Sequence, residues 1–494
     1  MLAPEIVDAL ADVVGRDGLI AQPAERRVYE CDGWTMAKQV PDVVVLPRTT
    51  EQVAAVVRVL HRYRIAFVPR GAGTGLSGGC LALEAPVMIC TSRLNRIVEI
   101  DLVNRCAVVE AGVVNLAVTR AVAPHGLLYA PDPSSQSACT IGGNVAENSG
   151  GPHTLKYGVT TNHVLGLELV LPDGEVLQLG GAMEDVPGYD LRGLVVGGEG
   201  TFGLVTRATL RLVREPEQWR TLLGVFETVD AASTAVSGII AAGIVPAALE
   251  MMDRLIVEAV EAAYHFGFPT DAGAVLIVEL DGPAVELDAQ MRAVIEICRA
   301  HGAREVRVAA DEAERAALWK SRKRAFGAVG RLAPNYCTQD GVVPRTKVPD
   351  ILRAIGAAAE RHRLRIANVF HAGDGNIHPI LLYDERDADE VRRVIAAGHE
   401  ILRACVELGG SITGEHGIGV EKIGELPLIF GPQDLLVMQA LRGVFDPERR
   451  ANPGKIFPTP GGCVEITRPR KQAPGRSCRD WLGAPDRTRR ATPA

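Results

Sequence analysis

PRGAGTGLSGG, residues 69–79, is the stretch that decides how the first half of this sequence folds. It directly follows the apolar run Ile65–Val68, which predicts a buried strand, and it holds too much glycine for a helix. Successive small residues let consecutive backbone N–H groups converge on a phosphate, which a Cβ would obstruct. By itself, a glycine-rich loop is more often structural than ligand-binding.

Two common nucleotide-binding motifs do not match this loop. A dinucleotide fingerprint requires a third glycine where Leu76 stands, followed directly by a helix. A P-loop requires Gly-Lys-Ser/Thr, whereas the only cation nearby is Arg70. If the loop binds an anion, it therefore does so with a structure that differs from both the dinucleotide fingerprint and the P-loop.

The residues before the loop predict a βαβ unit. Val43–Leu46 is a short apolar run bounded by prolines, as expected for a strand. Residues 50–63 (TEQVAAVVRVLHRY) place their apolar positions on one helical face, with Thr50 predicted as the N-cap. Ile65–Val68 then completes the unit as its second strand.

Two further loops share the composition of the first. PDPSSQSACTIGGNVAENSGG (131–151) is rich in small hydroxyl and amide residues, and GGEGTFGLVT (197–206) runs into a strand. The segments around them are short apolar runs broken by glycine turns, with the clearest hairpin at Asp173-Gly174. The first ~215 residues therefore predict an α+β domain in which backbone lines one extended ligand, such as a dinucleotide.

The composition excludes several other classes. The 494 residues are 47% hydrophobic and 23% charged, which excludes disorder for most of the chain, and a net charge of -7 gives no overall attraction to nucleic acid. None of the ten cysteines has CxxC spacing, so no iron–sulfur cluster is indicated. No run reaches the ~18 apolar residues of a membrane span, and the N-terminus lacks the cations of a signal peptide. We expect a cytoplasmic protein.

The second half alternates strands and helices and predicts an α+β domain with a mainly antiparallel sheet. In HAGDGNIHP (371–379) a turn separates two apolar runs, so a hairpin would bring His371 and His378 together as a plausible imidazole pair. SITGEHGIG (411–419) adds Glu415 and His416. A His₂Glu set is a catalytic ligand type for zinc-like ions, while a helix-start pair is the alternative reading of Glu415-His416.

Taken in order, these motifs resemble the vanillyl-alcohol oxidase/p-cresol methylhydroxylase superfamily over residues 41–457. Within it they resemble the D-2-hydroxyacid dehydrogenase branch, nearest to the flavin subunits of bacterial glycolate oxidases. The resemblance implies an α+β fold: a two-subdomain FAD-binding domain and an α+β cap domain. We expect an N-terminal helical segment (1–40), the FAD domain (41–215), a cap carrying a metal site (216–430), and a return to the FAD domain (431–460). Residues 461–494 are expected to be a basic, disordered tail, with a docking segment as the alternative.

The resemblance assigns FAD contacts to residues in all three loops and near the C-terminus. They are Pro69, Arg70, Gly71, Ala72, Gly73, Thr74, Gly75, Leu76 and Ser77; Pro131, Asp132, Pro133, Ser134, Thr140, Gly142, Gly143, Asn148 and Ser149; Gly198, Glu199 and Gly200; and Asn452. Some relatives attach FAD covalently through a histidine in the first loop. No histidine lies between Pro69 and Gly79, so non-covalent FAD is expected.

The resemblance also implies roles in the second half. His371, His378 and Glu415 match the ligands of a divalent metal, with zinc expected and manganese or iron as alternatives, and His416 matches the general base. Arg322, in LWKSRK, matches a substrate-binding arginine, with Lys320, Lys323 and Arg324 as solvated neighbours. Dicarboxylate-using relatives place lysine near Thr338 or Gln339 and asparagine at Ile380. These departures favour a small monocarboxylate.

The implied activity is oxidation of glycolate to glyoxylate by hydride transfer to flavin N5. The implied partners are a smaller FAD-domain subunit and an iron–sulfur subunit, which would bring the protein to the inner face of the membrane. The alternatives are a D-lactate dehydrogenase (or one for another D-2-hydroxy acid) acting alone and a non-catalytic flavin-binding subunit. A zinc hydrolase would leave the three glycine loops unexplained.

Overall fold

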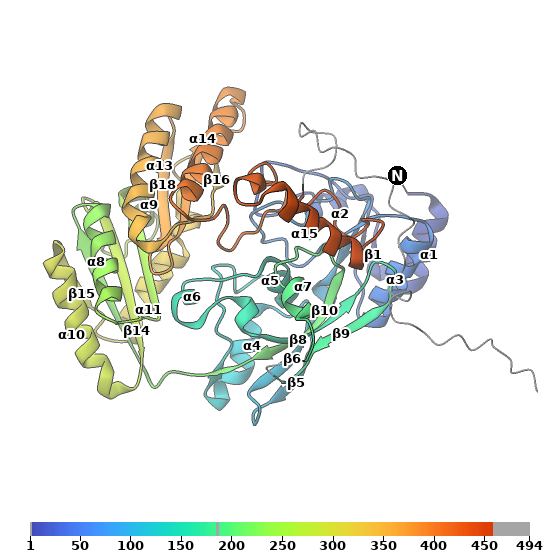
Figure 1. The fold of residues 1–494 in the computed structure, drawn as a ribbon, viewed down its shortest axis with the longest axis horizontal. Helices are drawn as coiled ribbons and strands as arrows, with labels where there is room; N and C mark the ends of the chain where they lie inside the picture. Colours follow the sequence, from blue (N-terminus) through green and yellow to red (C-terminus); the bar gives the residue numbers. More distant parts are fainter. Residues whose placement is uncertain (1, 184–186, 458–494) are drawn as a thin grey trace, which may run out of the picture.

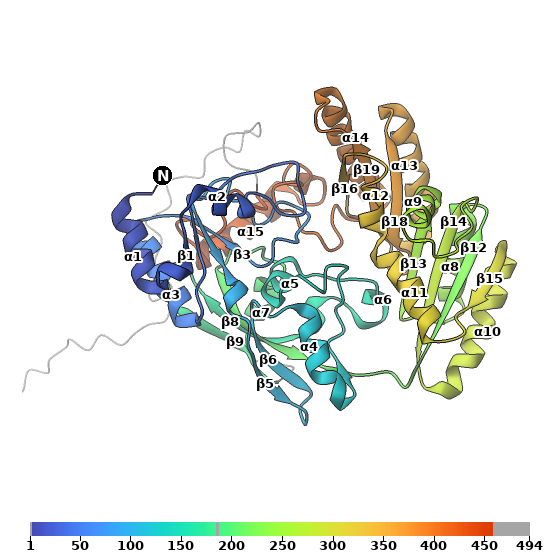
Figure 2. The ribbon, with the colours of Figure 1, turned by 180° about the vertical axis from the view of Figure 1, so that it is seen from behind.

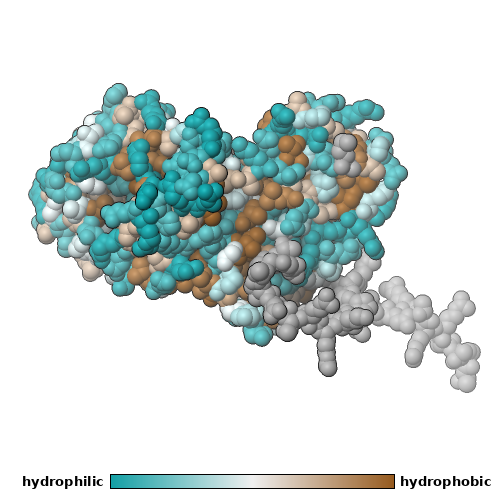
Figure 3. All heavy atoms as spheres, turned by 90° about the horizontal axis from the view of Figure 1, so that it is seen from above, coloured by the Kyte–Doolittle hydropathy of each residue, from teal (hydrophilic) through white to brown (hydrophobic). Residues whose placement is uncertain are grey.

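The computed structural model describes residues 2–183 and 187–457. The tail expected at 461–494 lies outside these residues. The molecule has two lobes, with helix α1 (Pro4–Val14) and strand β15 (Ala303–Val308) at opposite ends (Figures 1 and 2). Seen from above, a notch divides the two lobes (Figure 3).

The first lobe begins with a four-stranded sheet in the order β1-β2-β4-β3. Its members are β1 (Leu19–Ile20), β2 (Val43–Val45), β4 (Val87–Cys90) and β3 (Phe67–Arg70), and the last three are parallel. Helix α3 (Thr50–Arg62) connects β2 to β3 and buries the apolar face that the sequence predicts, including Val53 and Leu60. The predicted βαβ unit is therefore confirmed.

The predicted helix cap is wrong by one residue. Thr49, in extended conformation, is the N-cap, and its side chain accepts a hydrogen bond from the Gln52 amide at 3.2 Å. Thr50 lies inside the first turn, where its buried hydroxyl donates to Glu168 at 2.5 Å. The Thr-Thr pair offers two equivalent caps locally, and the partner that distinguishes them is 118 positions away in the sequence.

A second, antiparallel sheet completes this lobe in the order β5-β6-β10-β8-β9. Its strands are β5 (Ile97–Asp101), β6 (Cys106–Glu110), β10 (Leu204–Arg211), β8 (Val164–Val170) and β9 (Val176–Gly180). The hairpin predicted at Asp173-Gly174 is confirmed as β8–β9, and Gly174 adopts the positive φ that this turn requires. The short helix α5 (Ile141–Glu147) packs against β10.

The second lobe is an eight-stranded sheet in which every described strand pair is antiparallel, as expected. Its main path is β15, β12 (Gln218–Phe226), β14 (Ala274–Gly282), β13 (Ala248–Asp253), β18 (Arg365–His371), β19 (Asn376–Tyr383) and β16 (Asn335–Thr338); β17 (Gly341–Val342) also pairs with β19.

Successive strand residues serve the two faces of this sheet. On one face Met251 and Phe370 pack under α8 (Val229–Ala241), α10 (Ala284–Ala300), α13 (Val348–His362) and α14 (Ala388–Glu407). On the other, Met252 and Val369 pack under α9 (Arg254–Tyr264), α11 (Glu312–Lys323) and α12 (Ala325–Val329). Neighbouring residues of a strand point to opposite faces of the sheet. Because both members of each pair are apolar here, both faces of the sheet are apolar.

The end of the chain returns to the first lobe, where α15 (Pro432–Phe445) lies across it (Figure 1). The segment that follows α15 pairs with Phe67 of β3. The Phe67 amide donates to the Arg450 carbonyl at 2.9 Å, and the Phe67 carbonyl accepts from the Asn452 amide at 2.8 Å. Residues near 451 thus form a parallel bridge beside β3.

A buried polar network joins the two lobes around His153. Its ring lies 2.9 Å from Asp132 in the first lobe and 3.3 Å from Glu279 in the second. Burial lowers the pKa of His153, but the two carboxylates outweigh it and raise the pKa to about 10. Lys156 and Tyr157 bind Asp281 in the same way across the junction.

Candidate functional site

A cavity of about 580 Å³ runs through the first lobe to the edge of the second. Of the predicted FAD contacts, those that line it are Pro69, Arg70, Gly71, Ala72, Gly73, Thr74, Gly75, Leu76, Pro133, Ser134, Thr140, Gly142, Gly143, Ser149, Glu199, Gly200 and Asn452. All three glycine-rich loops therefore meet at one space, as the sequence predicts.

The first loop leaves room that side chains would fill. A Cβ added at Gly75 would meet only the Asp32 carboxylate, at 3.8 Å, and would otherwise project into the cavity. Gly73 and Gly200 adopt positive φ, and a Cβ at Gly200 would lie 2.5 Å from Pro69. These positions require glycine for both backbone conformation and close approach.

Five predicted FAD contacts lie outside the cavity lining and support it instead. The Ser77 carbonyl accepts from the Val420 and Glu421 amides, Pro131 accepts from Asn115, and Asp132 binds His153. Asn148 adopts positive φ at the end of α5 and accepts from Thr161, while the Gly198 carbonyl accepts from Thr201.

Glu199 and Asn452 connect the cavity to other segments. The Glu199 carboxylate accepts hydrogen bonds from the Ile418 and Gly419 amides, both at 2.7 Å. Asn452 donates its side-chain amide to the carbonyls of Gly79, at 2.9 Å, and Glu199, at 2.6 Å. The third loop thereby holds both the segment after His416 and the C-terminal return.

Strand pairing brings the predicted metal ligands together. His371 ends β18 and His378 lies on β19, on the sheet face covered by α9, α11 and α12. The Nε2 atoms of His371 and His378 lie 3.4 and 3.3 Å from Glu415 Oε1. Ligand atoms of a tetrahedral zinc ion, each about 2.0–2.1 Å from the metal, lie about 3.3–3.4 Å apart. Both distances to Glu415 therefore match such an ion, and the three ligand atoms all lie within 4.8 Å of one another.

Glu250 supports this group and was not predicted. It lies opposite His371 in the β13–β18 register, and its carboxylate is 2.6 Å from His371 Nδ1. This contact keeps the Nδ1 side of the ring occupied, so Nε2 faces Glu415. Burial raises the pKa of Glu250, but Arg322 and His371 outweigh it and hold the carboxyl below its usual range.

Arg322 lies behind this group rather than in the cavity lining. It is 1% exposed, and its Nε lies 2.6 Å from Glu250. Its two terminal nitrogens have no hydrogen-bond partner among the described residues. Lys323, expected to be a solvated neighbour, is partly exposed and lines the cavity together with Phe326.

His416 lies beside the metal group, at the same end of the cavity. Its ring stacks on His378 with centroids 5.1 Å apart and an interplanar angle of 7°. Burial lowers the pKa of His416; Asp340 opposes this, His378 and Lys422 add to it, and the result is a pKa of about 4. The imidazole is therefore neutral at pH 7 and able to accept a proton.

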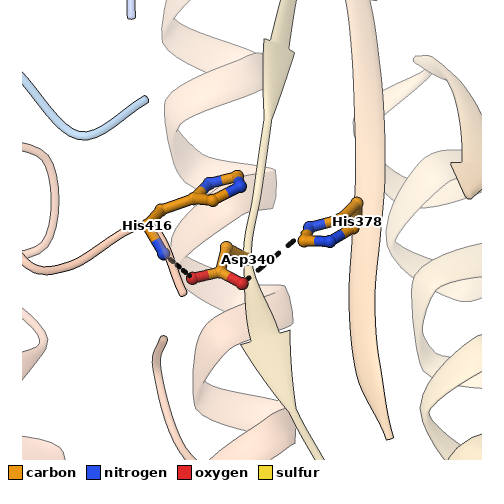
Figure 4. A group of neighbouring side chains, drawn as sticks. All are labelled: Asp340, His378 and His416. Atoms are coloured by element: carbon orange, nitrogen blue, oxygen red, sulfur yellow. Dashed lines mark hydrogen bonds and ion pairs between the residues drawn. The ribbon is translucent and has the colours of Figure 1, made fainter. Parts of the chain in front are cut away.

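Asp340 is a second residue that sequence reasoning missed. It is fully buried and faces both His378 and the backbone of His416 (Figure 4). The segment around Glu415 and His416 has no helix, which excludes the helix-start reading. Neither Asp340 nor Glu250 belongs to a local motif, so no spacing signal identifies them.

Comparison with known proteins agrees with this geometry. Residues 41–180 match the family described as FAD binding domain, and residues 215–456 match FAD linked oxidases, C-terminal domain. Glycolate oxidase subunit GlcD of Escherichia coli strain K12 is 48% identical over 438 residues, covering 89% of this chain and 88% of that protein. D-lactate dehydrogenase of Anaerostipes hadrus is 31% identical, covering 92% and 98%. The crystal structure of p-cresol methylhydroxylase with substrate bound has a TM-score of 0.76 at 16% identity, covering 92% and 96%.

The fold is that of p-cresol methylhydroxylase, and the two family matches define the class of protein as a flavin-binding oxidoreductase. The chain belongs to the family of FAD-linked oxidases. Within the described residues, no helix is both long enough and apolar enough to cross a membrane.

Proposed function

We propose that this protein oxidises a small 2-hydroxy acid, glycolate first among them, to the 2-oxo acid with FAD as the acceptor. The observation that carries the proposal is that one cavity contains both the glycine-rich FAD loops and the group of His378, Glu415 and His416. The residues proposed to bind FAD and those proposed to act on the substrate thus line the same cavity. The 48% identity to a glycolate oxidase subunit supports glycolate as the substrate.

The residues fit both groups that the family implies. The space facing Gly75 accommodates a flat or extended ligand that a side chain would displace, which supports FAD. Two imidazoles, each at tetrahedral distance from one carboxylate oxygen, suit a divalent ion such as zinc, with manganese or iron as alternatives. FAD, when bound, supplies the hydride acceptor, and the metal, when bound, supplies a Lewis acid that lowers the pKa of the substrate hydroxyl.

The chain's own residues then hold the substrate and move its proton. His416, neutral at pH 7, would accept the hydroxyl proton as general base. Arg322 stays the proposed partner of the substrate carboxylate, but because it pairs with Glu250 outside the cavity lining, its guanidinium would have to turn away from Glu250 to reach an anion in the cavity. Lys323, at the cavity wall, adds a second cation in reach of an anionic substrate.

The experiment that tests this function is anaerobic titration of the purified flavoprotein while its absorbance is recorded. We expect the flavin band to bleach with glycolate and to return with an electron acceptor. If no 2-hydroxy acid bleaches the flavin in metal-loaded protein, the chain is a non-catalytic flavin-binding subunit. Release of yellow FAD into the supernatant after acid precipitation would support non-covalent attachment, as expected from the absence of histidine in the first loop.

D-lactate is the second candidate substrate, supported by the D-lactate dehydrogenase relative. One added methyl group changes discrimination by about 1–3 kcal/mol, so both acids can react. Comparing kcat/KM for glycolate, D-lactate, L-lactate and D-2-hydroxyglutarate ranks them. A dicarboxylate that reacts fastest would refute the preference for a small monocarboxylate.

We also propose the domain limits 1–40, 41–215, 216–430 and 431–460, and a cytoplasmic location. The relative named as a subunit supports assembly with other chains, for which a smaller FAD-domain subunit and an iron–sulfur subunit are the candidates. Through them the protein would reach the inner face of the membrane. Co-purification of an iron–sulfur protein with the tagged chain tests this assembly.

A further inference from the structure

Asp340 holds the segment that carries Glu415 and His416. It lies in the two-residue break between β16 and β17, which both pair with β19, and its side chain is fully buried. A single oxygen, Oδ2, accepts hydrogen bonds from the Thr413 hydroxyl and from the amides of Gly414, Glu415 and His416, at 2.6, 2.9, 3.2 and 2.9 Å. Because this segment has no helix or strand of its own, the carboxylate takes the place of secondary structure there.

The charge of Asp340 is balanced from one side by a buried lysine. The Lys422 ammonium lies 3.4 Å from Oδ2 and is itself fully buried. Burial raises the pKa of Asp340, but His416, Lys422 and His378 outweigh it and hold the carboxyl well below its usual range. Asp340 is therefore a carboxylate at neutral pH.

The other oxygen of Asp340 faces His378. Oδ1 lies 3.8 Å from His378 Nδ1, and neither atom has a hydrogen-bond partner among residues 2–183 and 187–457. The Nε2 atom of the same ring is the one that lies 3.3 Å from Glu415. This separation is longer than a hydrogen bond, but the negative charge of the carboxylate on the Nδ1 side favours the tautomer with its proton on Nδ1, which leaves the Nε2 lone pair free.

We propose that Asp340 is a positioning residue that sets the tautomer of His378 and at the same time fixes the backbone of Glu415 and His416. This inference rests on the proposed metal-dependent function. Asp340, His378 and His416 also have ligand atoms within 4.8 Å of one another, as a metal site would. A second metal there is disfavoured, because Oδ2 already accepts four hydrogen bonds and lies beside the Lys422 cation.

The substitution Asp340→Asn tests the tautomer directly. An asparagine of the same shape must aim its oxygen at the four donors of the 413–416 segment, which leaves its NH₂ facing His378. His378 Nδ1 must then accept, so Nε2 carries the proton and is lost as a ligand. Loss of such an outer partner lowers metal affinity by about 10- to 100-fold.

The measurement is zinc affinity of the metal-stripped flavoprotein, by competition with a chromophoric chelator, with FAD content and Tm recorded alongside. The matched control is Asp253→Asn, which removes another buried carboxylate that accepts backbone hydrogen bonds, from Ile256 and Asn368. We expect Asp340→Asn to bind zinc at least tenfold more weakly with FAD retained, and Asp253→Asn to keep its zinc affinity although its Tm falls.

Three outcomes separate the possibilities. If Asp340→Asn binds zinc within threefold of the wild type, Asp340 does not position His378. If the wild type binds two zinc ions and the variant one, Asp340 is itself a ligand and the inference is wrong. If His371→Ala binds zinc as tightly as the wild type does, the proposed metal centre is wrong, and the inference about Asp340 is wrong with it. Should Asp340→Asn not fold, Asp340→Asn/Lys422→Met removes the unbalanced cation and carries the same expectation.

Discussion

Replacing Glu279 with glutamine should destabilise the second lobe and weaken its contact with His153 of the first lobe. Its buried carboxylate accepts from Thr221 at 2.6 Å, from Trp319 at 2.5 Å and from Arg315 at 2.8 and 3.0 Å, and lies 3.3 Å from His153. Burial raises the pKa of Glu279, but the bonds from His153 and Arg315 outweigh it and lower the pKa from 4.5 to about 2.

This difference in pKa sets the size and the sign of the effect. At about 1.36 kcal/mol per pKa unit, a fall from 4.5 to about 2 corresponds to about 3 kcal/mol of stability. Because the folded pKa is the lower one, this stability is present above pH 4.5 and is lost as the pH falls towards 2. For a unit of the size of residues 215–456, about 3 kcal/mol lowers Tm by about 6–12 °C.

The assay is thermal unfolding followed by tryptophan fluorescence, since Trp319 bonds Glu279 directly and Trp219 packs on Arg315. We expect Glu279→Gln to lower Tm at pH 7. The difference in Tm between the wild type and the variant should narrow between pH 5 and pH 3, because the wild type loses this stability there. Glu305→Gln, at an exposed position on β15, is the matched control and should change Tm by less than 1 °C. A gap that is equally wide at pH 7 and pH 3 would refute the reasoning.

Three further predictions concern the cavity. His416→Ala should lower turnover of glycolate by about 10²- to 10⁴-fold while FAD stays bound, as stopped-flow flavin reduction would measure; near wild-type reduction would exclude the base role. Gly75→Val should weaken FAD binding by about 5- to 150-fold, because filling the cavity costs about 1–3 kcal/mol, whereas Gly356→Val, in open space on α13, should not; fluorescence titration of the apoprotein with FAD compares them. Dialysis against a chelator should slow flavin reduction by glycolate, and zinc should restore it in the wild type but not in His378→Ala; a rate unaffected by metal content would contradict the metal role.

Local patterns predicted the parts of the site that lie within one segment. The turn between His371 and Asn376 places His371 and His378 on neighbouring strands. The high glycine content of the loops indicates where the backbone needs positive φ or close approach. The contacts that orient these residues come from far along the chain. Glu250 precedes His371 by 121 positions and meets it only because β13 pairs with β18, which no periodicity reveals.

Residue spacing along the chain also could not predict the N-cap of α3 or the position of Lys323. The adjacent residues Thr49 and Thr50 offer the same hydroxyl to the start of α3, and Glu168 on another strand decides which one caps. Lys323 looks like one more exposed cation in a basic run, yet the packing of α11 places it at the cavity wall. In both cases tertiary contact, rather than local propensity, determines the role.

The parallel bridge beside β3 has a consequence for how the protein is made. Asn452 closes onto Gly79 across 373 positions of sequence, so the cofactor lobe lacks this wall until nearly the whole described chain has been translated. At about 5–20 residues per second, the ribosome needs about 20–75 seconds between the two. The flavin loops are therefore translated well before residue 452, and we expect tight binding of the cofactor only after that residue has been made.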